Sequence, residues 1–337
     1  MENKCESCGA RIAFDPKSGM LKCDHCESKF SIKTSLQGNR KREYTGEFSS
    51  SGENKDKFGY RCGICGAQIS VGSGEEIKRC PSCGNVSLTP CGDYSKSPDA
   101  IVPFSITRKQ AADIFKEWIA KRKFAPHDLK VMARLEKISG YYTPVYNFSY
   151  DTYCDYYGVA VKTERDFDGE ERSHSYIVND TLHRRIDNIL YSASKNVTDD
   201  FLSNFGAYPL DEMKTFSPEF LFGYTATDAS RDITKAYNQI VRDEKNINER
   251  LVHSRISSKY DSIDSLDCKT SLKNVKFNYL YVPVWANHYT YKGKIYHCFI
   301  NGATGAVCGK SPKSIGKVFA ITFGVLAAAA AIVLLLI

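Results

Sequence analysis

Four Cys-x-x-Cys pairs within the first 83 residues constrain the fold of this chain more than any other feature. Residues 5–26 read CESCGARIAFDPKSGMLKCDHC, and residues 62–83 read CGICGAQISVGSGEEIKRCPSC. Each block holds two pairs separated by a 14-residue loop, and the blocks repeat with a period of 57 residues. Each pair places two thiolates on one tight turn, so two such turns complete a tetrahedral site with Zn–S bonds of about 2.3 Å.

The repeat therefore predicts two structural zinc ribbons, each binding one Zn²⁺ ion through four cysteines. The glycine after each first pair, Gly9 and Gly66, allows a positive φ that directs backbone amides toward the sulfurs. An iron–sulfur site and redox-active pairs are the alternatives, but neither explains the twice-used spacing so directly. Because protein fills all four ligand positions, the zinc would be structural, not catalytic. The expected ligands are Cys5, Cys8, Cys23 and Cys26 in the first ribbon, and Cys62, Cys65, Cys80 and Cys83 in the second.

The segment between the ribbons, residues 34–60, is rich in Gly, Ser, Asn and charge and predicts a flexible linker. Its run of Arg40, Lys41 and Arg42 is the single basic cluster of the region. Residues 1–99 hold 15 Lys and Arg against 13 Asp and Glu, and eight thiolates with two zinc ions bring this to about −2. Nucleic-acid modules usually carry a basic patch, so the charge balance argues against nucleic acid as the ligand.

Residues 100–309 predict one α+β domain with an antiparallel sheet. A capping box at Thr107 and Gln110 predicts a helix over 107–124, and apolar spacing predicts a second helix over 227–248, whose buried stripe ends at Glu244. Both helices are expected to serve core packing.

Aromatic and β-branched residues predict strands over 143–161 and 282–302, the latter turning at Lys292-Gly293. Both segments begin with Pro-Val-aromatic, so a duplication and two unrelated strands remain alternatives. No phosphate loop, His-Glu-x-x-His or Gly-x-Ser-x-Gly motif occurs, and the sequence predicts no enzyme. His288 and His297 flank the turn and are expected to face one another as structural residues.

The last 20 residues, 318–337, carry no charge and predict one transmembrane helix, since about 30 Å of helix spans a bilayer core. A buried soluble helix is the alternative, but it would show a polar face. Lys310, Lys313 and Lys317 precede the segment, so the N-terminal domains are expected in the cytoplasm, with the protein a single-pass component of the cell membrane. Gly and Ala at every fourth position from Gly316 fit either helix association, with itself or another protein, or plain lipid contact.

The segments CESCGARIAFDPKSGMLKCDHCESKF, SPEFLFGY, VPVW and YKGKIYHCFINGATGAVCG resemble the bacterial TFIIB-type zinc-ribbon membrane proteins over essentially the whole chain. They are especially similar to the zinc-ribbon proteins of Bacillus PspA-type membrane-stress operons. The resemblance implies a tail-anchored adaptor that recruits an SPFH-domain scaffold and PspA to the membrane, with the same eight cysteines as ligands. A membrane-tethered nucleic-acid binder is the alternative function.

The sequence thus predicts an α+β protein with five segments: a first zinc ribbon over 1–33, a linker over 34–60, a second ribbon over 61–92, an α+β domain over 100–309 and a transmembrane helix over 318–337.

Overall fold

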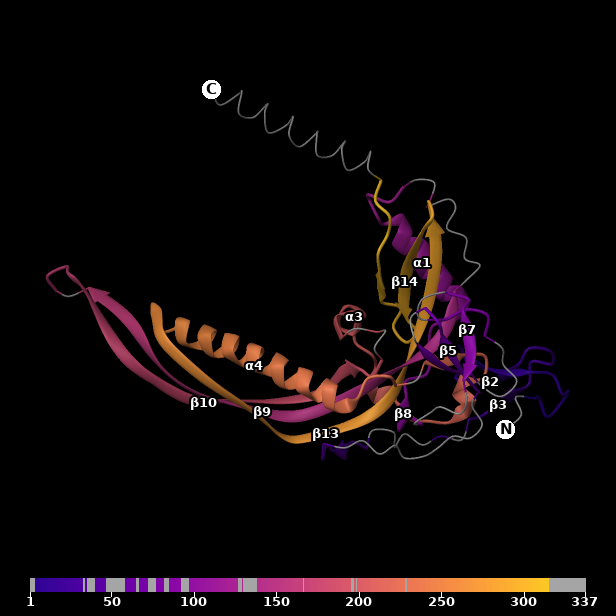
Figure 1. Ribbon diagram of the computed structural model, residues 1–337, viewed down its shortest axis with the longest axis horizontal. Coiled ribbons are helices and arrows are strands. Elements are labelled where there is room, and N and C mark those ends of the chain that lie inside the picture. The colour runs from indigo at the N-terminus through magenta and orange to yellow at the C-terminus, as the bar shows by residue number, and fades with distance from the viewer. Residues whose placement is uncertain are drawn as a thin grey trace, which may run out of the picture.

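The computed structural model describes residues 4–314, with gaps at 33, 35–39, 47–57, 65–66, 72–76, 82–84, 92–96, 127–128, 130–137, 166, 195–196, 198 and 228. Within these residues the chain is mostly β-structure (Figure 1). A small three-stranded sheet contains β1 (Ile12–Asp15), β2 (Met20–Cys23) and β3 (Lys29–Phe30).

A second sheet holds the other twelve strands of the described residues. They are β4 (Arg42–Glu43), β5 (Phe58–Cys62), β6 (Gln68–Val71), β7 (Leu88–Cys91), β8 (Ala100–Ile101), β9 (Ser139–Arg165), β10 (Glu171–Ser192), β11 (Lys214–Thr215), β12 (Thr225–Thr227), β13 (Ser262–Tyr291), β14 (Lys294–Asn301) and β15 (Val307–Gly309). The helices are α1 (Arg108–Ala120), α3 (Asp199–Asn204) and α4 (Ile233–Ser257), with 3₁₀ turns η2 (Leu210–Glu212) and η3 (Pro218–Leu221).

The large sheet is mixed. Its main path runs β11-β8-β13-β9-β12-β6-β5-β7, with β10 beside β9, β14 and β4 beside β13, and β15 beside β14. The pairs β12–β9 and β13–β8 are parallel, whereas the other pairs of this sheet are antiparallel. Strands β5 to β7 of the second cysteine-rich block therefore belong to the same sheet as the rest of the chain, through the pairing of β6 with β12.

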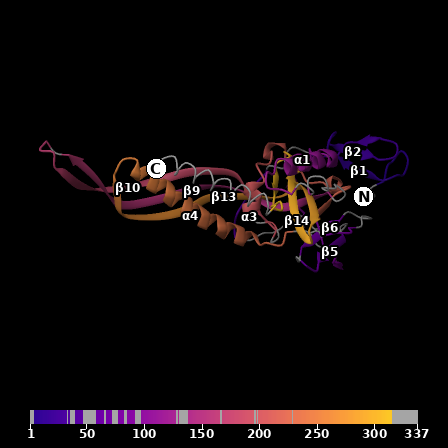
Figure 2. The ribbon, with the colours of Figure 1, turned by 90° about the horizontal axis from the view of Figure 1, so that it is seen from above.

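The burial of the long strand β9 changes along its length. Residues 141–148 of β9 are buried at every position, as expected for a strand covered on both faces. From Tyr150 to Ala160 burial alternates, because one face lies under α4 and the other faces solvent. We call the distal part of β9, β10 and β13 (residues 149–165, 171–186 and 262–275), together with α4, the arm. The arm projects from the rest of the molecule, and within it the β9–β10 hairpin extends beyond α4 and β13 (Figures 1 and 2).

A buried polar network joins α4 to strands β9 and β10 of the arm. Glu244 is 2% exposed, accepts a hydrogen bond from the Tyr150 hydroxyl at 3.0 Å, and pairs with Arg184 Nη1 at 2.9 Å. The same guanidinium donates to Asn248 Oδ1, and the Asn248 amide donates to Thr152 Oγ1, both at 2.9 Å. The predicted end of the buried stripe at Glu244 is therefore wrong, because paired polar groups continue it to the buried Val252 and Ile256.

Several sequence predictions are confirmed within the described residues. Helix α1 begins after Thr107 with both halves of the capping box, and α4 overlaps the second predicted helix but ends nine residues later, at Ser257. The turn between β13 and β14 lies at Lys292 and Gly293, with φ of 48° and 76°. The two Pro-Val-aromatic motifs lie on the antiparallel neighbours β9 and β13, with Pro144 opposite Tyr281 and Pro283 opposite Tyr142.

Residues 40–46, inside the predicted linker, lie against the large sheet. Strand β4 pairs with β13, and Arg42 contacts Asp99 at 2.7 Å. Lys41 donates hydrogen bonds to Ser149 and, at 2.7 Å, to Asn188. The Tyr44 ring stacks on Tyr237 of α4 at 4.5 Å. This part of the segment is therefore docked on the sheet.

The predicted fold class and membrane placement are corrected. The fold is dominated by one mixed sheet, not by an α+β domain with an antiparallel sheet, because segments without a strong sequence signal, including all of β10, are long strands. No helix among the described residues is long and apolar enough to cross a membrane. The longest of them, α4, is amphipathic, with one face on the strands of the arm and charged residues such as Lys245 and Arg250 on the other. The predicted single-pass protein of the cell membrane is thus not supported, and the predicted helix over 318–337 lies outside the described residues.

Candidate metal centre

Two equivalent turns hold the cysteines of the first ribbon. The Cys5 N–H donates to Ala10 O at 2.6 Å, and the Cys23 N–H donates to Ser28 O at 3.0 Å. In each turn the residue after the second cysteine donates back to the first cysteine's carbonyl, from Gly9 to Cys5 and from Glu27 to Cys23. Both of those residues have left-handed backbones, with φ of 70° and 60°. The positive φ expected at Gly9 is confirmed. The positive φ of Glu27 was not predicted from the sequence. Its position was the available signal, because Glu27 follows Cys26 as Gly9 follows Cys8.

These turns bring four sulfurs together. Cys5 Sγ lies 3.5 Å from Cys26 Sγ, Cys8 Sγ lies 3.5 Å from Cys23 Sγ, and all four sulfurs lie within 4.8 Å of one another. Four ligands at about 2.3 Å from a tetrahedral ion would lie ~3.8 Å apart, so the cluster has the dimensions of a metal site. Cys5 and Cys23 are buried while Cys8 and Cys26 are exposed, which places the site at the surface with two ligands anchored in the interior.

The electrostatics of the cluster call for a cation. Contacts of the Cys26 sulfur with the Ser28 hydroxyl, at 3.1 Å, and with the Ser28 backbone lower the pKa of Cys26 to about 6. The Ala10 backbone N–H favours a thiolate at Cys8, but the interaction with Cys26 and the other thiols outweighs it and raises the pKa of Cys8 to about 12. A thiolate at Cys26 therefore opposes a second thiolate at Cys8, and a cation between the two sulfurs would favour both.

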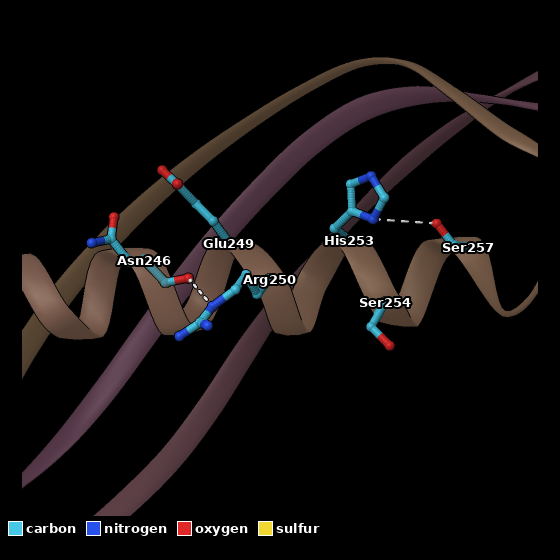
Figure 3. A pocket seen from close by; sticks show the side chains of 6 residues that line it. All are labelled: Asn246, Glu249, Arg250, His253, Ser254 and Ser257. Carbon is cyan, nitrogen blue, oxygen red and sulfur yellow. Dashed lines mark hydrogen bonds between the residues drawn. The ribbon is translucent and has the colours of Figure 1, made fainter. Parts of the chain in front are cut away.

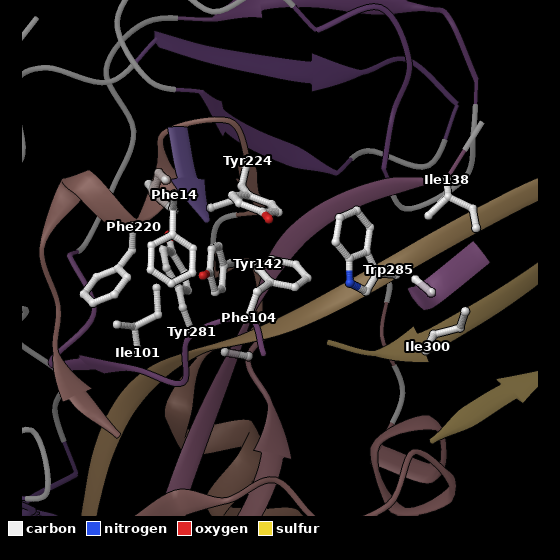
Figure 4. Packing of buried hydrophobic residues seen from close by; sticks show 14 of the residues in the cluster. Phe14, Ile101, Phe104, Ile138, Tyr142, Phe220, Tyr224, Tyr281, Trp285 and Ile300 are labelled. Atoms are coloured by element: carbon white, nitrogen blue, oxygen red, sulfur yellow. The ribbon is translucent and has the colours of Figure 1, made fainter. Parts of the chain in front are cut away.

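The first ribbon is part of the main hydrophobic core. Its residues Cys5, Ile12, Phe14, Leu21 and Cys23 belong to one buried cluster with the aromatic residues of the large sheet. The Phe14 N–H donates to Phe222 O at 2.9 Å, and its ring lies 5.3 Å from Phe220. Figure 4 shows Phe14 between Phe220 and Tyr224, with Phe104 stacked on Tyr224 at 4.4 Å. A metal bound to the cluster would thus hold β1 and β2 against the core.

The second ribbon is described in part, since Cys65 and Cys83 lie outside the described residues. Cys62 and Cys80 are buried in a small cluster with Ala67 and Ile69. Their N–H groups donate to Ala67 O at 2.9 Å and to Asn85 O at 2.7 Å, five residues onward, as at Cys5 and Cys23. Among the described residues the first ribbon alone brings four candidate ligands together.

His288 and His297 face one another across the β13–β14 pair, as predicted. Their Nδ1 atoms are 2.7 Å apart, and His288 Nε2 lies 2.9 Å from Pro81 O of the second ribbon. If His288 carries its proton on Nε2 to donate to Pro81, its Nδ1 accepts from His297 Nδ1. Burial lowers the pKa of His288 to about 4 and also lowers the pKa of His297, which keeps both rings neutral at pH 7. The pair therefore serves as a structural contact between the hairpin and the second ribbon.

A shallow hollow lies along the outer face of α4, with a volume of about 870 Å³ (Figure 3). The described residues that line it come from this one helix, and the hydrogen bonds among them stay within it, between Ser257 Oγ and His253 Nδ1 and from Arg250 Nε to Asn246 O. Among the described residues, no group from another element converges on the hollow.

Comparisons with known proteins give one relative without an assigned activity. The chain is 26% identical over 325 residues to "Uncharacterized protein YdjG" of Bacillus subtilis (strain 168). The aligned residues cover 94% of this chain and 92% of the relative. No protein-family model matches the chain. No solved structure matches it. The resemblance to TFIIB-type zinc-ribbon proteins therefore stays a prediction.

Proposed function

We propose that this protein is a zinc-ribbon adaptor that binds a protein partner and has no catalytic role of its own. The observation that carries the proposal is the four-cysteine cluster of the first ribbon, whose ligand positions are all supplied by protein and whose strands pack into the core. A metal in such a site stabilises structure and has no open position for a substrate.

Zinc is the metal that this ligand set favours, because four thiolates in a tetrahedral arrangement match its preferred chemistry. The proposal includes a second Zn²⁺ ion held by Cys62, Cys65, Cys80 and Cys83. Its support is the repeated sequence spacing and the backbone hydrogen bonds at Cys62 and Cys80, which match those of the first ribbon.

A protein partner is favoured over nucleic acid by the contacts of the basic run. Lys41 donates hydrogen bonds to Ser149 and Asn188, and Arg42 pairs with Asp99 and lies over the Phe277 ring. Burial lowers the pKa of Lys41 to about 8, which further weakens its use as a cation for phosphate. Two of the three residues in this run therefore make contacts within the chain.

The second ribbon offers an apolar surface for a partner. Ile64, between Cys62 and Cys65, is 68% exposed, and Val86 is 62% exposed. Exposed large apolar side chains are suited to a protein contact, because removing them from water on binding is favourable. The partner classes implied by the sequence resemblance are an SPFH-domain scaffold and PspA.

Crosslinking pulldown of the full-length protein, with an SPFH-domain protein and PspA as candidate prey, tests the proposal. Ile64→Asp combined with Val86→Asp should reduce capture at least about tenfold, because an interface centre tolerates charge poorly. Ile295→Asp, at a similarly exposed residue of β14, is the matched control and should leave capture unchanged.

Titration against random-sequence duplex and single strands at several salt concentrations tests the alternative ligand. No binding near physiological salt is expected. Submicromolar, steeply salt-dependent binding would overturn the adaptor proposal.

A further inference from the structure

Strand β10 has one edge that faces away from β9, and the proposed function assigns no role to this edge. Among the described residues, β10 pairs with β9 alone along its length, from Glu171 opposite Arg165 to Ser192 opposite Val145. Its other edge therefore presents backbone N–H and C=O groups that β9 does not satisfy. Such an edge is a template for another strand unless charge, proline or a bulge disrupts it.

The middle of this edge lacks those protective features. Residues 173–179 read SHSYIVN, without Lys, Arg, Asp, Glu, Pro or Gly. The irregularity in the β10–β9 register lies elsewhere, between Ile186 and Ile189. Ile177 is 68% exposed and Tyr176 is 40% exposed, so two large side chains with high strand propensity lie at the surface of the edge strand.

We propose that a second copy of this chain pairs with β10 through its own β10, in antiparallel orientation about a two-fold axis. The three strands of each arm would then join into one sheet in the order β13-β9-β10-β10-β9-β13. This interface is independent of the proposed adaptor function. An isologous pairing of this kind closes after two copies, so it predicts a dimer and no longer assembly.

Charged and hydrogen-bonding side chains along β10 make the edge complementary to itself in two registers. With the axis at Tyr176, Arg172 of each copy lies opposite Asp180 of the other. With the axis at Ile177, His174 lies opposite Asp180 and Glu171 opposite His183, and an imidazole N–H is a hydrogen-bond donor to a carboxylate. Asp180 also pairs with Arg255 of its own copy at 2.9 Å, but a carboxylate has room to accept from two donors.

The two adjacent registers bring like charges together. An axis one residue earlier, at Ser175, places Glu170, just before β10, opposite Asp180. An axis at Val178 places Arg172 opposite Arg184, although it also places Glu171 opposite Arg185. Like charges directly opposite one another destabilise a strand pair. The position of α4 is compatible with the pairing, because its contacts are most extensive with β13, on the far side of β9 from the free edge of β10.

Sedimentation of the full-length protein over about 1–100 µM tests the pairing, since an interface of this limited size is expected to dissociate in the micromolar range. The protein should shift from monomer to dimer with increasing concentration. Ile177→Asp should raise the dissociation constant at least about tenfold, because it places two carboxylates at or beside the axis. The matched control is Tyr157→Asp, at a 56% exposed residue of the central strand β9, which should leave association unchanged.

Engineered cysteines identify the register. Under mild oxidation either Tyr176→Cys or Ile177→Cys should form a disulfide-linked dimer above the level of the parent protein, because residues at the axis lie opposite their own copies within disulfide reach. Ser173→Cys should not, since it would lie ~20 Å or more from its counterpart in either register.

A protein that remains monomeric over the whole concentration range would overturn the proposal. A dimer that Ile177→Asp leaves intact, or in which neither axis cysteine crosslinks, would also overturn it and place the interface elsewhere. Sedimentation and cysteine crosslinking are both done with this protein alone, without the adaptor's partner. A negative result would therefore overturn the dimer and leave the proposed adaptor function untouched.

Discussion

The four cysteine side chains of the first ribbon lie close enough for a negative charge on one sulfur to affect the pKa of another. Cys5 and Cys23 are held inside by backbone turns, while Cys8 and Cys26 complete the cluster from the surface. The pKa of Cys26 is lowered and that of Cys8 is raised, because a thiolate at one sulfur disfavours a thiolate at the other unless a cation lies between them. Metal binding and proton release are therefore coupled at this site.

Replacing one buried ligand tests the cluster. Cys23→Ser should lower the zinc content by about one ion per chain, because a serine hydroxyl is a poor zinc ligand and three thiolates leave the site open. Elemental analysis of the purified protein measures the change. Cys308→Ser, at a half-buried cysteine of β15 outside the cluster, should retain the parental zinc content. Equal zinc in both variants would contradict the assignment.

The His288–His297 contact predicts a specific pH dependence. The pKa of His288 in the folded protein is about 4, below the ordinary value of 6.5, because burial disfavours the charged ring. The folded state thus binds fewer protons than the unfolded state below about pH 6.5. Stability should fall as pH drops from about 6.5 to about 4, by about 3 kcal/mol, and this contribution should level off below that range.

Urea unfolding at pH 7 and pH 5 measures the effect. His288→Asn should show a smaller loss of stability between the two pH values than the parent protein. His253→Gln, on the outer face of α4, should keep the parental loss. An unchanged loss in His288→Asn would assign the acid sensitivity to other groups, the thiols among them.

At the scale of elements, α4 depends on the polar network around Glu244. Glu244→Ala should lower the free energy of unfolding by about 3 kcal/mol, because Arg184 would keep a partly buried charge without its carboxylate. Urea unfolding gives the energy, and hydrogen exchange should show faster opening of α4 and the facing part of β9. The matched control is Glu249→Ala. Glu249 is a partly exposed residue of α4 that pairs with Lys245 at 3.9 Å, and its replacement should lower the free energy of unfolding by less than about 0.5 kcal/mol.

A second variant separates charge from packing in this network. Glu244→Leu with Arg184→Met replaces the pair by apolar groups and should recover most of the lost stability. If the double variant is as unstable as Glu244→Ala, the instability comes from the lost hydrogen bonds of this network. An unpaired charge on Arg184 would then not be its cause.

At the scale of the whole molecule, the first ribbon and the large sheet share one core. Phe14→Ala should lower the free energy of unfolding by about 3 kcal/mol, since a buried ring at the contact with Phe220 is lost. Hydrogen exchange should increase both in β1 and in η3. Phe167→Ala, at the exposed tip of the β9–β10 hairpin, should change stability by less than about 0.5 kcal/mol.

Metal removal tests the same coupling without a mutation. A chelator should lower the midpoint of the main unfolding transition, because the metal-bound ribbon covers aromatic residues of the central core. A separate early transition with an unchanged main midpoint would show that the ribbon unfolds independently.

The amino-acid sequence by itself determined the local features of this protein. The spacing of the cysteines predicted the cluster of the first ribbon, since two turns with fixed geometry need only their own residues to aim two sulfurs each. The capping box at Thr107 predicted the start of α1, and Lys292-Gly293 predicted the hairpin turn, because both depend on hydrogen bonds or backbone angles within a few residues. The pairing of His288 with His297 followed from their equal distance from that turn.

The tertiary structure decided the partners of these local elements. Strand β10 has weak alternation and many polar residues, so its own sequence does not identify it, and pairing with β9 makes it a strand. Glu244 interrupts the apolar stripe of α4 by sequence, yet Arg184, distant in the chain, makes its burial favourable. The basic run at residues 40–42 looks exposed by sequence, but Asp99, Ser149 and Asn188 engage two of its members. In each case the stabilising group comes from a remote part of the chain, and a local pattern carries no information about groups that meet only after folding.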